Sequence, residues 1–292
     1  MAFINQTLGK YIGDKINKSD FFFDDTLIDF YENSNEIDVF VNLFKTAIMP
    51  FTTRMQNVNR WLEVGIGDGT KLLKILPLLN SNTKIDLTFL EPSDKWLHQL
   101  NISGNLDKIR KLQNVKVNLN GSNITFEDYV NEKNVFNFDF ISFIHIIHNS
   151  DLSETLFDFI DKKRNGKDFY LLITLENETN DLYKMRKLLY EKIDIDLPIS
   201  QLSYIEEEIK ERKFEYSKFN TRNKELNIKP QEIINNNNHW FYPFLLGCKY
   251  AGFKTLYSKR KRDKIYDIVN DYLREINKID INDTTIVATI KY

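Results

Sequence analysis

The chain of 292 residues is poor in cysteine and histidine and has no long apolar run. Cys248 is its single cysteine, which excludes an internal disulfide and a cysteine-rich zinc site. No apolar stretch approaches the roughly 20 residues that span a bilayer, and the residues after Met1 lack the pattern of a signal peptide. We therefore expect a reduced, cytoplasmic protein with no membrane partner.

An excess of charge of either sign is lacking as well. Lys and Arg total 40 and Asp and Glu total 42, so the formal net charge is -2. Because basic and acidic residues are nearly equal in number, there is no electrostatic reason to expect nucleic acid as a partner, since phosphate binding depends on a basic surface. The length and the 42% hydrophobic content suffice for one large or two modest domains with a hydrophobic core. We expect the protein to act as a monomer.

Between Arg60 and Leu175, short apolar runs typical of strands alternate with amphipathic stretches typical of helices. Such alternation predicts right-handed βαβ units and a parallel sheet that helices cover on both faces. The predicted strands are 61–64, 84–90, 115–117, 138–147 and 169–175, and the predicted helices are 70–79, 152–162 and a stretch that ends at Leu100.

After Leu175 the alternation is less regular. The elements predicted there are helices at 181–193 and 201–211, a strand at 214–220, a loop around Trp240, a helix at 261–278 and a strand at 284–290 that returns to the sheet edge. These changes divide the chain into an N-terminal helical lid (1–58), a ligand-binding core (59–175), a substrate-binding subdomain (176–240) and a C-terminal return of the sheet (241–292).

The most informative motif is a glycine-rich turn at the end of the first predicted strand. Gly65, Gly67 and Gly69 stand just before the helix that Thr70 opens. Glycine permits a tight turn there and lets backbone N–H groups approach a ligand, while the helix starts close to the sheet. Glu91 ends the second strand, where a carboxylate can accept hydrogen bonds from both ribose hydroxyls of an adenosyl cofactor.

Three kinds of nucleotide site compete for this turn, besides a turn that binds nothing. A phosphate-binding P-loop requires Gly-Lys-Ser/Thr after a longer loop, and Gly69-Thr70-Lys71 has another order. A dinucleotide site requires G-x-G-x-x-G, whereas this turn reads G-x-G-x-G, and Glu63 would repel a pyrophosphate. An acid at that position suits the cationic methionine end of S-adenosylmethionine (AdoMet). The turn therefore favours AdoMet as the cofactor.

Residues at the ends of the later strands add candidates. Thr125 lies in the loop after the third strand, which in such a sheet commonly contacts adenine, although Thr125 is equally suited to cap the next helix. His145 and His148 end the fourth strand, where ligands of parallel sheets bind, and His148 serves equally well as a structural histidine. A metal site with Asp151 lacks a third strong ligand nearby in sequence, so we expect no metal. The predicted cofactor-binding set is Glu63, Gly65, Gly67, Gly69, Glu91, Ser93, Thr125 and Ile144.

On these residues the chain resembles the class I AdoMet-dependent methyltransferases, and among them most of all the histamine N-methyltransferase family. The resemblance rests on the glycine turn and on Tyr31–Glu36, Glu91-Pro92-Ser93, Phe138–Ile141 and Asn282–Thr284. It implies a Rossmann-like α/β fold with a mostly parallel seven-stranded sheet, an N-terminal helical lid and a smaller substrate subdomain. It also implies methyl transfer to the amine nitrogen of a small molecule.

The resemblance also implies a substrate site. The amine-binding glutamate of that family is similar to Glu36, a substrate-contacting glutamine corresponds to His145, and an asparagine corresponds to Asp283. Two of these three positions differ in residue type, and His148-Asn149 replaces an aromatic pair, so the resemblance does not extend to histamine as the substrate. Glu36, His145 and Asp283 are the implied catalytic residues. The predicted substrate-binding residues are Phe23, His148, Asn149 and Trp240.

Methyl transfer from a sulfonium is an in-line displacement, so the protein must position the nucleophile and keep it unprotonated. Glu36 and Asp283 would accept hydrogen bonds from the amine or stabilise the product ammonium, and a neutral His145 would take the proton. Aromatic side chains would bind the cation and exclude water. An O-methyltransferase, a peptide or protein methyltransferase, and an inert AdoMet-binding module remain alternatives.

Overall fold

The computed structural model describes residues 24–49, 60–79, 83–132, 137–145, 150–163, 168–193, 202–248 and 250–291. These residues form two compact units. Unit 1 comprises the described residues within Met1–Glu36, Glu176–Ser200 and Arg222–Asp283. Unit 2 comprises those within Ile37–Leu175, Gln201–Thr221 and Thr284–Tyr292.

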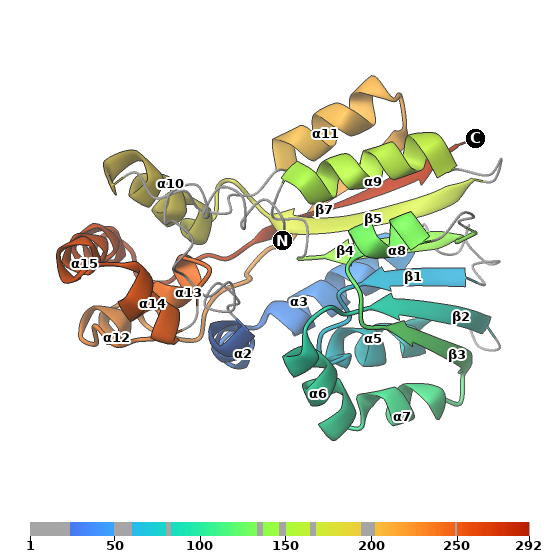
Figure 1. Ribbon diagram of the computed structural model, residues 1–292, viewed down its shortest axis with the longest axis horizontal. Coiled ribbons are helices and arrows are strands. Elements are labelled where there is room, and N and C mark those ends of the chain that lie inside the picture. The colour runs from blue at the N-terminus through green and yellow to red at the C-terminus, as the bar shows by residue number, and fades with distance from the viewer. Residues whose placement is uncertain are drawn as a thin grey trace. The chain divides into compact units, whose positions relative to one another are not determined.

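A seven-stranded sheet of order β3-β2-β1-β4-β5-β7-β6 forms the centre of unit 2 (Figure 1). Its strands are β1 (Arg60–Val64), β2 (Thr83–Leu90), β3 (Val115–Ser122), β4 (Phe140–Ile144), β5 (Phe169–Glu176), β6 (Glu215–Asn220) and β7 (Asp283–Ile290). Parallel ladders join β1 to β2 and β4, β2 to β3, and β4 to β5, whereas β6 and β7 pair antiparallel. The seven strands agree with the sequence-based prediction, but the sheet is mixed rather than mostly parallel.

Two strands, β3 and β4, differ from their predicted bounds by more than one residue at an end. β3 is longer than 115–117, because it pairs with β2 along its whole length although Asn and Gly are poor strand formers. Gly121 is required in it, since a Cβ there would lie 2.2 Å from Cζ of Phe89 on β2. β4 is shorter than 138–147. It follows Asp139, which accepts hydrogen bonds from Arg60, and it ends before His145, whose φ of 59° leaves the extended conformation.

The closing strand β7 corrects a second expectation. It begins one residue before the predicted range 284–290, and it lies between β5 and β6 instead of at the sheet edge. Buried side chains occupy both of its faces, from Thr284 to Ala288. A strand that is buried on both faces reads as a continuous apolar run, which does not reveal whether one neighbour or two will pair with it.

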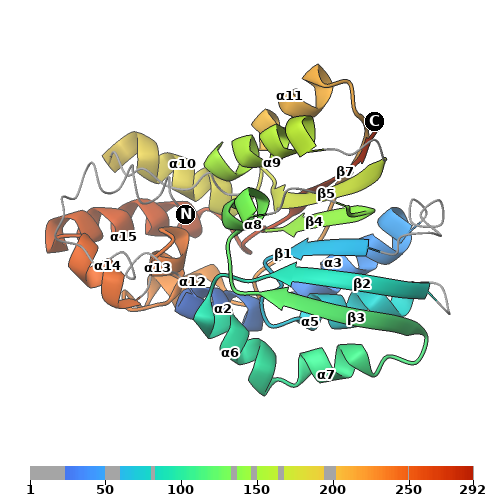
Figure 2. The same ribbon diagram turned by 45° about the vertical axis from the view of Figure 1, so that its right-hand side comes forward.

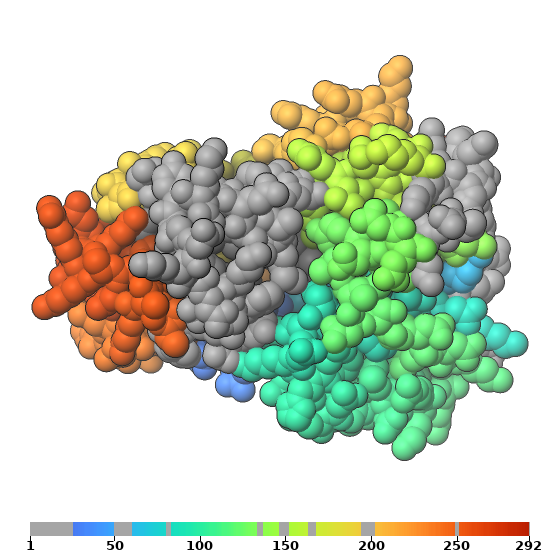
Figure 3. All heavy atoms as spheres, in the orientation of Figure 1, coloured from blue at the N-terminus to red at the C-terminus, as the bar shows by residue number. Residues whose placement is uncertain are grey.

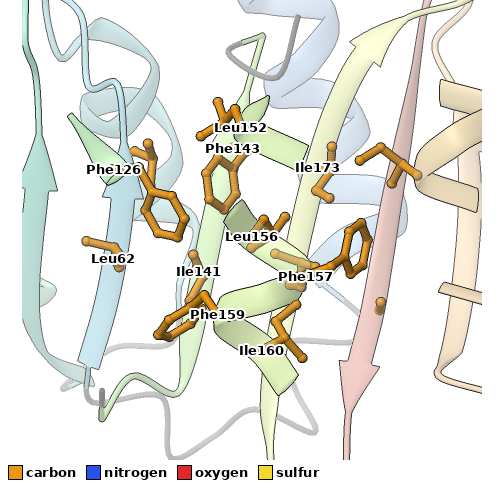
Figure 4. Close-up of a cluster of buried hydrophobic side chains, with 14 of the residues drawn as sticks. Leu62, Phe126, Ile141, Phe143, Leu152, Leu156, Phe157, Phe159, Ile160 and Ile173 are labelled. Carbon is orange, nitrogen blue, oxygen red and sulfur yellow. The ribbon is translucent and has the colours of Figure 1, made fainter. Parts of the chain in front are cut away.

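Helices cover both faces of the sheet. On one face lie α8 (Phe126–Glu132), α9 (Ser150–Lys163) and α11 (Leu202–Glu211), and on the other lie α3 (Glu36–Leu43), η2 (Phe44–Ile48), α5 (Thr70–Ile75), α6 (Asp94–Ile102) and α7 (Asn105–Arg110). Figure 4 shows the hydrophobic core between the sheet and α8, α9 and α11. In it, side chains of α9 such as Leu156 and Phe157 pack against Ile141, Phe143 and Ile173. α8 and α9 lie next to each other on the near surface in Figure 3. The sheet and these helices form the three layers of a doubly wound α/β fold.

Unit 1 is mainly helical. It contains α2 (Asp24–Glu32), α10 (Asp181–Ile193), α12 (Pro230–Ile234), α13 (Phe241–Leu245), α14 (Tyr250–Leu256) and α15 (Lys259–Arg274). Its separate core includes Trp240 and Phe30, and the Phe30 ring stacks on Phe244 with centroids 4.6 Å apart. α10 agrees with the predicted helix, whereas the expected loop after Trp240 is the helix α13. No helix among the described residues is long and apolar enough to cross a membrane.

Candidate functional site

The carboxyl ends of β1 to β4 meet at one edge of the sheet in unit 2, as the parallel arrowheads of β1, β2 and β3 in Figure 2 illustrate. β1 lies between β2 and β4. The chain proceeds from β1 outward to β2 and β3, and then returns to the opposite side of β1 to form β4. This reversal is a topological switch point, and open α/β sheets bind ligands at the carboxyl ends of the strands beside it.

The glycine turn follows β1 at this switch point. Gly65, Gly67 and Gly69 have φ values of 73°, 60° and 77°, a left-handed region that glycine adopts without the Cβ clash of other residues. Gly69 is also packed closely, because a Cβ there would lie 2.8 Å from Cδ1 of Leu100 on α6. The Gly65 N–H donates to the Leu90 carbonyl oxygen at 2.7 Å and ties the turn to the end of β2. The three glycines therefore fix the shape of the turn.

Glu91 lies against this turn. Its Oε2 accepts a hydrogen bond from the Gly67 N–H at 2.9 Å, and its Oε1 accepts one from the Ser93 N–H at 3.0 Å. The side chain of Ser93 in turn caps α6 by accepting a hydrogen bond from the Trp96 N–H. Three predicted cofactor residues, Gly67, Glu91 and Ser93, thus form one hydrogen-bonded group. A carboxylate oxygen can accept a second hydrogen bond, so this geometry suits an acceptor for ribose hydroxyls.

The Glu63 side chain is hydrogen-bonded to the neighbouring strand β4. It lies opposite Ser142 in the β1–β4 ladder, and the Ser142 hydroxyl donates to its Oε2. The Trp61 indole N–H donates to the Ser142 Oγ at 2.6 Å. Burial raises the pKa of Glu63 to about 7, while the Ser142 hydrogen bond and the charge of Lys71 lower it. Glu63 therefore holds β1 against β4 with a carboxyl group that is partly protonated near neutral pH.

Thr125 and Ile144 complete the predicted cofactor set. The Thr125 Oγ1 donates to Asp128 Oδ2 at 2.9 Å and accepts from the Asp128 N–H at 3.1 Å, so this side chain caps α8. Ile144 is buried at the end of β4 in the core on the α5 side of the sheet. Both residues lie at the carboxyl edge, and their contact with a cofactor stays a prediction.

His145 is the first residue after β4. Its backbone N–H donates to the Thr174 carbonyl oxygen on β5 at 3.0 Å, and its φ of 59° turns the chain away from the strand. Such a conformation is uncommon for a residue other than glycine and often marks a functional position. His145 thus lies at the switch point, one strand away from the glycine turn.

Glu36 and Asp283 lie together in unit 1, joined by a residue that the sequence did not reveal. The Lys224 Nζ lies 3.3 Å from Glu36 Oε2 and forms a second ion pair with Asp283 Oδ2. The three side chains are only 2%, 2% and 1% exposed, in the order Glu36, Lys224 and Asp283. Glu36 is therefore buried, although it is the first residue of helix α3 and a solvent-exposed position is the usual one for a helix acid. Both carboxylates bind the ammonium of Lys224, which is the kind of group that an amine substrate is expected to present to them.

The remaining predicted substrate residues are placed only in part. Phe23, His148 and Asn149 lie outside the described residues. Trp240 is buried in the core of unit 1, where its ring packs edge-on against Phe244. No group of His, Cys, Asp and Glu suited to a metal ion occurs in the ranges that the structure describes.

The sequence offered unequal signals for the residues that were missed. Ser142 is the one hydroxyl in the apolar run FISFI, which made it noticeable in the sequence, whereas its pairing with Glu63 depends on the register of β1 and β4. Asp68 and Asn105 also support the turn: Asp68 accepts a hydrogen bond from the Thr70 N–H at 3.0 Å, and the Asn105 amide donates to the Asp68 carbonyl oxygen at 2.8 Å. Lys224 had no local signal, because its partners are remote in sequence.

Comparison with known proteins identifies the fold. No family model matches the chain, and no curated protein does. A cyclopropane-fatty-acyl-phospholipid synthase-like protein from Lactobacillus casei is similar in structure, with 12% identity, a TM-score of 0.50 and coverage of 85% of this chain and 92% of that chain. A SAM-dependent methyltransferase from Archaeoglobus fulgidus gives 14% identity, a TM-score of 0.43 and coverage of 85% and 94%. The chain has an α/β Rossmann-like methyltransferase fold.

Proposed function

We propose that the protein is an AdoMet-dependent methyltransferase that methylates the amine nitrogen of a small molecule. The observation that carries this proposal is the hydrogen bond from Gly67 of the glycine turn to the Glu91 carboxylate, at the switch point of a methyltransferase fold. The glycine turn offers backbone N–H groups, and Glu91 offers an acceptor suited to ribose hydroxyls, within one hydrogen-bonded group. The resemblance to histamine N-methyltransferases supports an amine, and it leaves the identity of that amine open.

The residues at the carboxyl edge fit AdoMet. Glu91 would accept the ribose hydroxyls, the glycine turn would let the cofactor approach the backbone, and Thr125 and Ile144 would lie near the adenine. Bound AdoMet supplies an electrophilic methyl group on a sulfonium. The acid at Glu63 would act indirectly, because its side chain is buried and accepts a hydrogen bond from Ser142 on the neighbouring strand β4.

The protein's own part in the reaction is positioning and proton removal. An amine attacks only through an unprotonated nitrogen, so the acceptor must reach the methyl group in line and lose its proton. His145 is the residue proposed to take that proton. The segment 1–58 as a lid and the segment 176–240 as a substrate subdomain would exclude water from the reacting groups. Phe23, His148, Asn149 and Trp240 stay proposed substrate residues.

The cofactor assignment predicts a selective loss of affinity in Glu91→Ala. This variant removes the acceptor for the ribose hydroxyls and the anchor for the Gly67 and Ser93 N–H groups, so AdoMet binding should weaken by roughly 1–3 kcal/mol. Isothermal titration calorimetry with AdoMet measures this loss. Asp94→Ala is the matched control, because Asp94 is a nearby exposed acid whose carboxylate is bonded to Asn123. Unchanged affinity in Glu91→Ala, or tight binding of NAD by the wild type, would contradict the assignment.

The acceptor assignment predicts that His145→Asn lowers turnover and leaves AdoMet affinity intact. Asparagine tolerates the left-handed backbone of this position, so the variant removes the imidazole without straining the turn. We expect kcat to fall at least about tenfold, since general bases commonly contribute that much or more. Mass spectrometry of methylated products from a panel of amines, alcohols and peptides measures turnover. A preference for alcohols or peptides would support another methyltransferase class, and AdoMet binding without any product would support an inert module.

A further inference from the structure

The chain passes between the two units at points where both flanking residues are described, namely after Glu36, Leu175, Thr221 and Asp283. On the unit 1 side of these passages, four chain segments are hydrogen-bonded to one another. These segments are 33–36, 176–180, 222–227 and 279–283, and they are called the crossing node here. All the contacts considered below belong to unit 1.

The first junction of the crossing node joins 33–36 to 222–227. The Asn227 N–H donates to the Asn33 carbonyl oxygen at 2.8 Å, and the Asn35 N–H donates to the Glu225 carbonyl oxygen at 3.4 Å. The Asn35 side chain adds two bonds, since its Oδ1 accepts from the Glu225 N–H and its Nδ2 donates to the Asn223 carbonyl oxygen. This junction depends largely on one asparagine.

The second junction joins 222–227 to 279–283. The Ile281 N–H donates to the Lys224 carbonyl oxygen at 3.0 Å, and the Lys224 N–H donates to Asn282 Oδ1 at 2.9 Å. Asn282 extends the node further, because its carbonyl oxygen accepts hydrogen bonds from the Asn177 N–H and the Asn180 side chain, both at 3.1 Å. Hydrogen bonds therefore link the four segments in series, from 33–36 through 222–227 and 279–283 to 176–180.

The buried triad of Glu36, Lys224 and Asp283 spans both junctions. Each carboxylate is the last residue of unit 1 before a passage, and the single Lys224 ammonium binds both. Burying three charges costs desolvation energy, so an apolar cluster would serve overall stability at least as well. Charged groups instead specify geometry, because an ammonium between two carboxylates holds the segments that carry them at defined positions.

We infer that the Glu36–Lys224–Asp283 triad is a lock that fastens three of the passages to one another on the unit 1 side. Lys224 is its central positioning residue. While both ion pairs of Lys224 are present, the segments before and after these passages in unit 1 open together rather than one by one. Loss of a single carboxylate frees only the segment that carried it.

The test is amide hydrogen exchange, measured by mass spectrometry, in Glu36→Gln and Asp283→Asn. Both substitutions keep the size of the side chain and leave one ion pair of Lys224 in place. Glu36→Gln should raise exchange at least tenfold at the amides of Asn35, Glu225 and Asn227, which belong to the first junction. Asp283→Asn should raise it to the same extent at Ile281 and at the other amides of the second junction.

Two further variants complete the design. Lys278→Met breaks an exposed ion pair to Glu225 in the same region and should leave both junctions protected. Lys224→Arg keeps the charge and should preserve most of the protection. The inference is overturned if Glu36→Gln and Asp283→Asn accelerate the same amides. It is also overturned if the amides of α15 in the core of unit 1 accelerate by the same factor, because the triad then supports only global stability.

Discussion

Lys224→Met should destabilise the protein by about 3–5 kcal/mol, the range for a buried ion pair that loses one partner. Methionine is similar to lysine in length and removes the charge together with the N–H donors. Glu36 and Asp283, at 2% and 1% exposure, would then lie buried without the ammonium that both contact. Denaturant unfolding followed by circular dichroism measures the loss, with separate fits if the two units unfold in separate steps.

Two controls distinguish charge burial from other effects of Lys224→Met. Lys278→Met removes a lysine whose ion pair with Glu225 is exposed, so it should change stability little. The triple variant Glu36→Gln, Lys224→Met, Asp283→Asn carries no charge at the triad and should be more stable than Lys224→Met. If Lys224→Met were no less stable than Lys278→Met, the triad would not be the buried electrostatic unit described above.

The sequence predicted features that depend on local signals. α10 coincides with the predicted helix 181–193, and the glycine turn, Glu91 and Ser93, which the sequence singles out, form one hydrogen-bonded group. In each case the information lies within a few neighbouring residues: a 3.6-residue period, glycines at a strand end, or an acid at the end of the next strand.

The features that the sequence did not reveal depend on pairing between remote segments. β7 lies between β5 and β6, and nothing in its apolar run distinguishes that place from the sheet edge. Lys224 lies 59 residues from Asp283, in a chain with 40 basic residues, so no spacing singles it out as the partner. Trp240 has the aromatic character of a binding residue, yet an aromatic core position has the same signature in sequence.

Glu63→Gln should remove a pH dependence of stability that the wild type shows between about pH 4.5 and pH 7. Burial raises the pKa of Glu63 from 4.5 to about 7 in the folded protein. Between these values the folded state keeps a proton that the unfolded chain has lost. Stability from this group is therefore complete below pH 4.5 and is lost as the pH rises to about 7. At about 1.4 kcal/mol per pH unit, the loss amounts to roughly 3 kcal/mol.

Unfolding free energies of the wild type and Glu63→Gln, measured from pH 4.5 to pH 8, test this expectation. Glutamine stays neutral throughout and can still bond to the Ser142 hydroxyl, so the variant should gain on the wild type as the pH rises, and the gain should level off above pH 7. Ser142→Ala provides the matched check. The Ser142 hydrogen bond lowers the pKa of Glu63, so its loss should extend the window to higher pH. Parallel pH profiles for the wild type and Glu63→Gln would mean that Glu63 ionises in the folded protein as it does in the unfolded chain, and that the β1–β4 contact tolerates its charge.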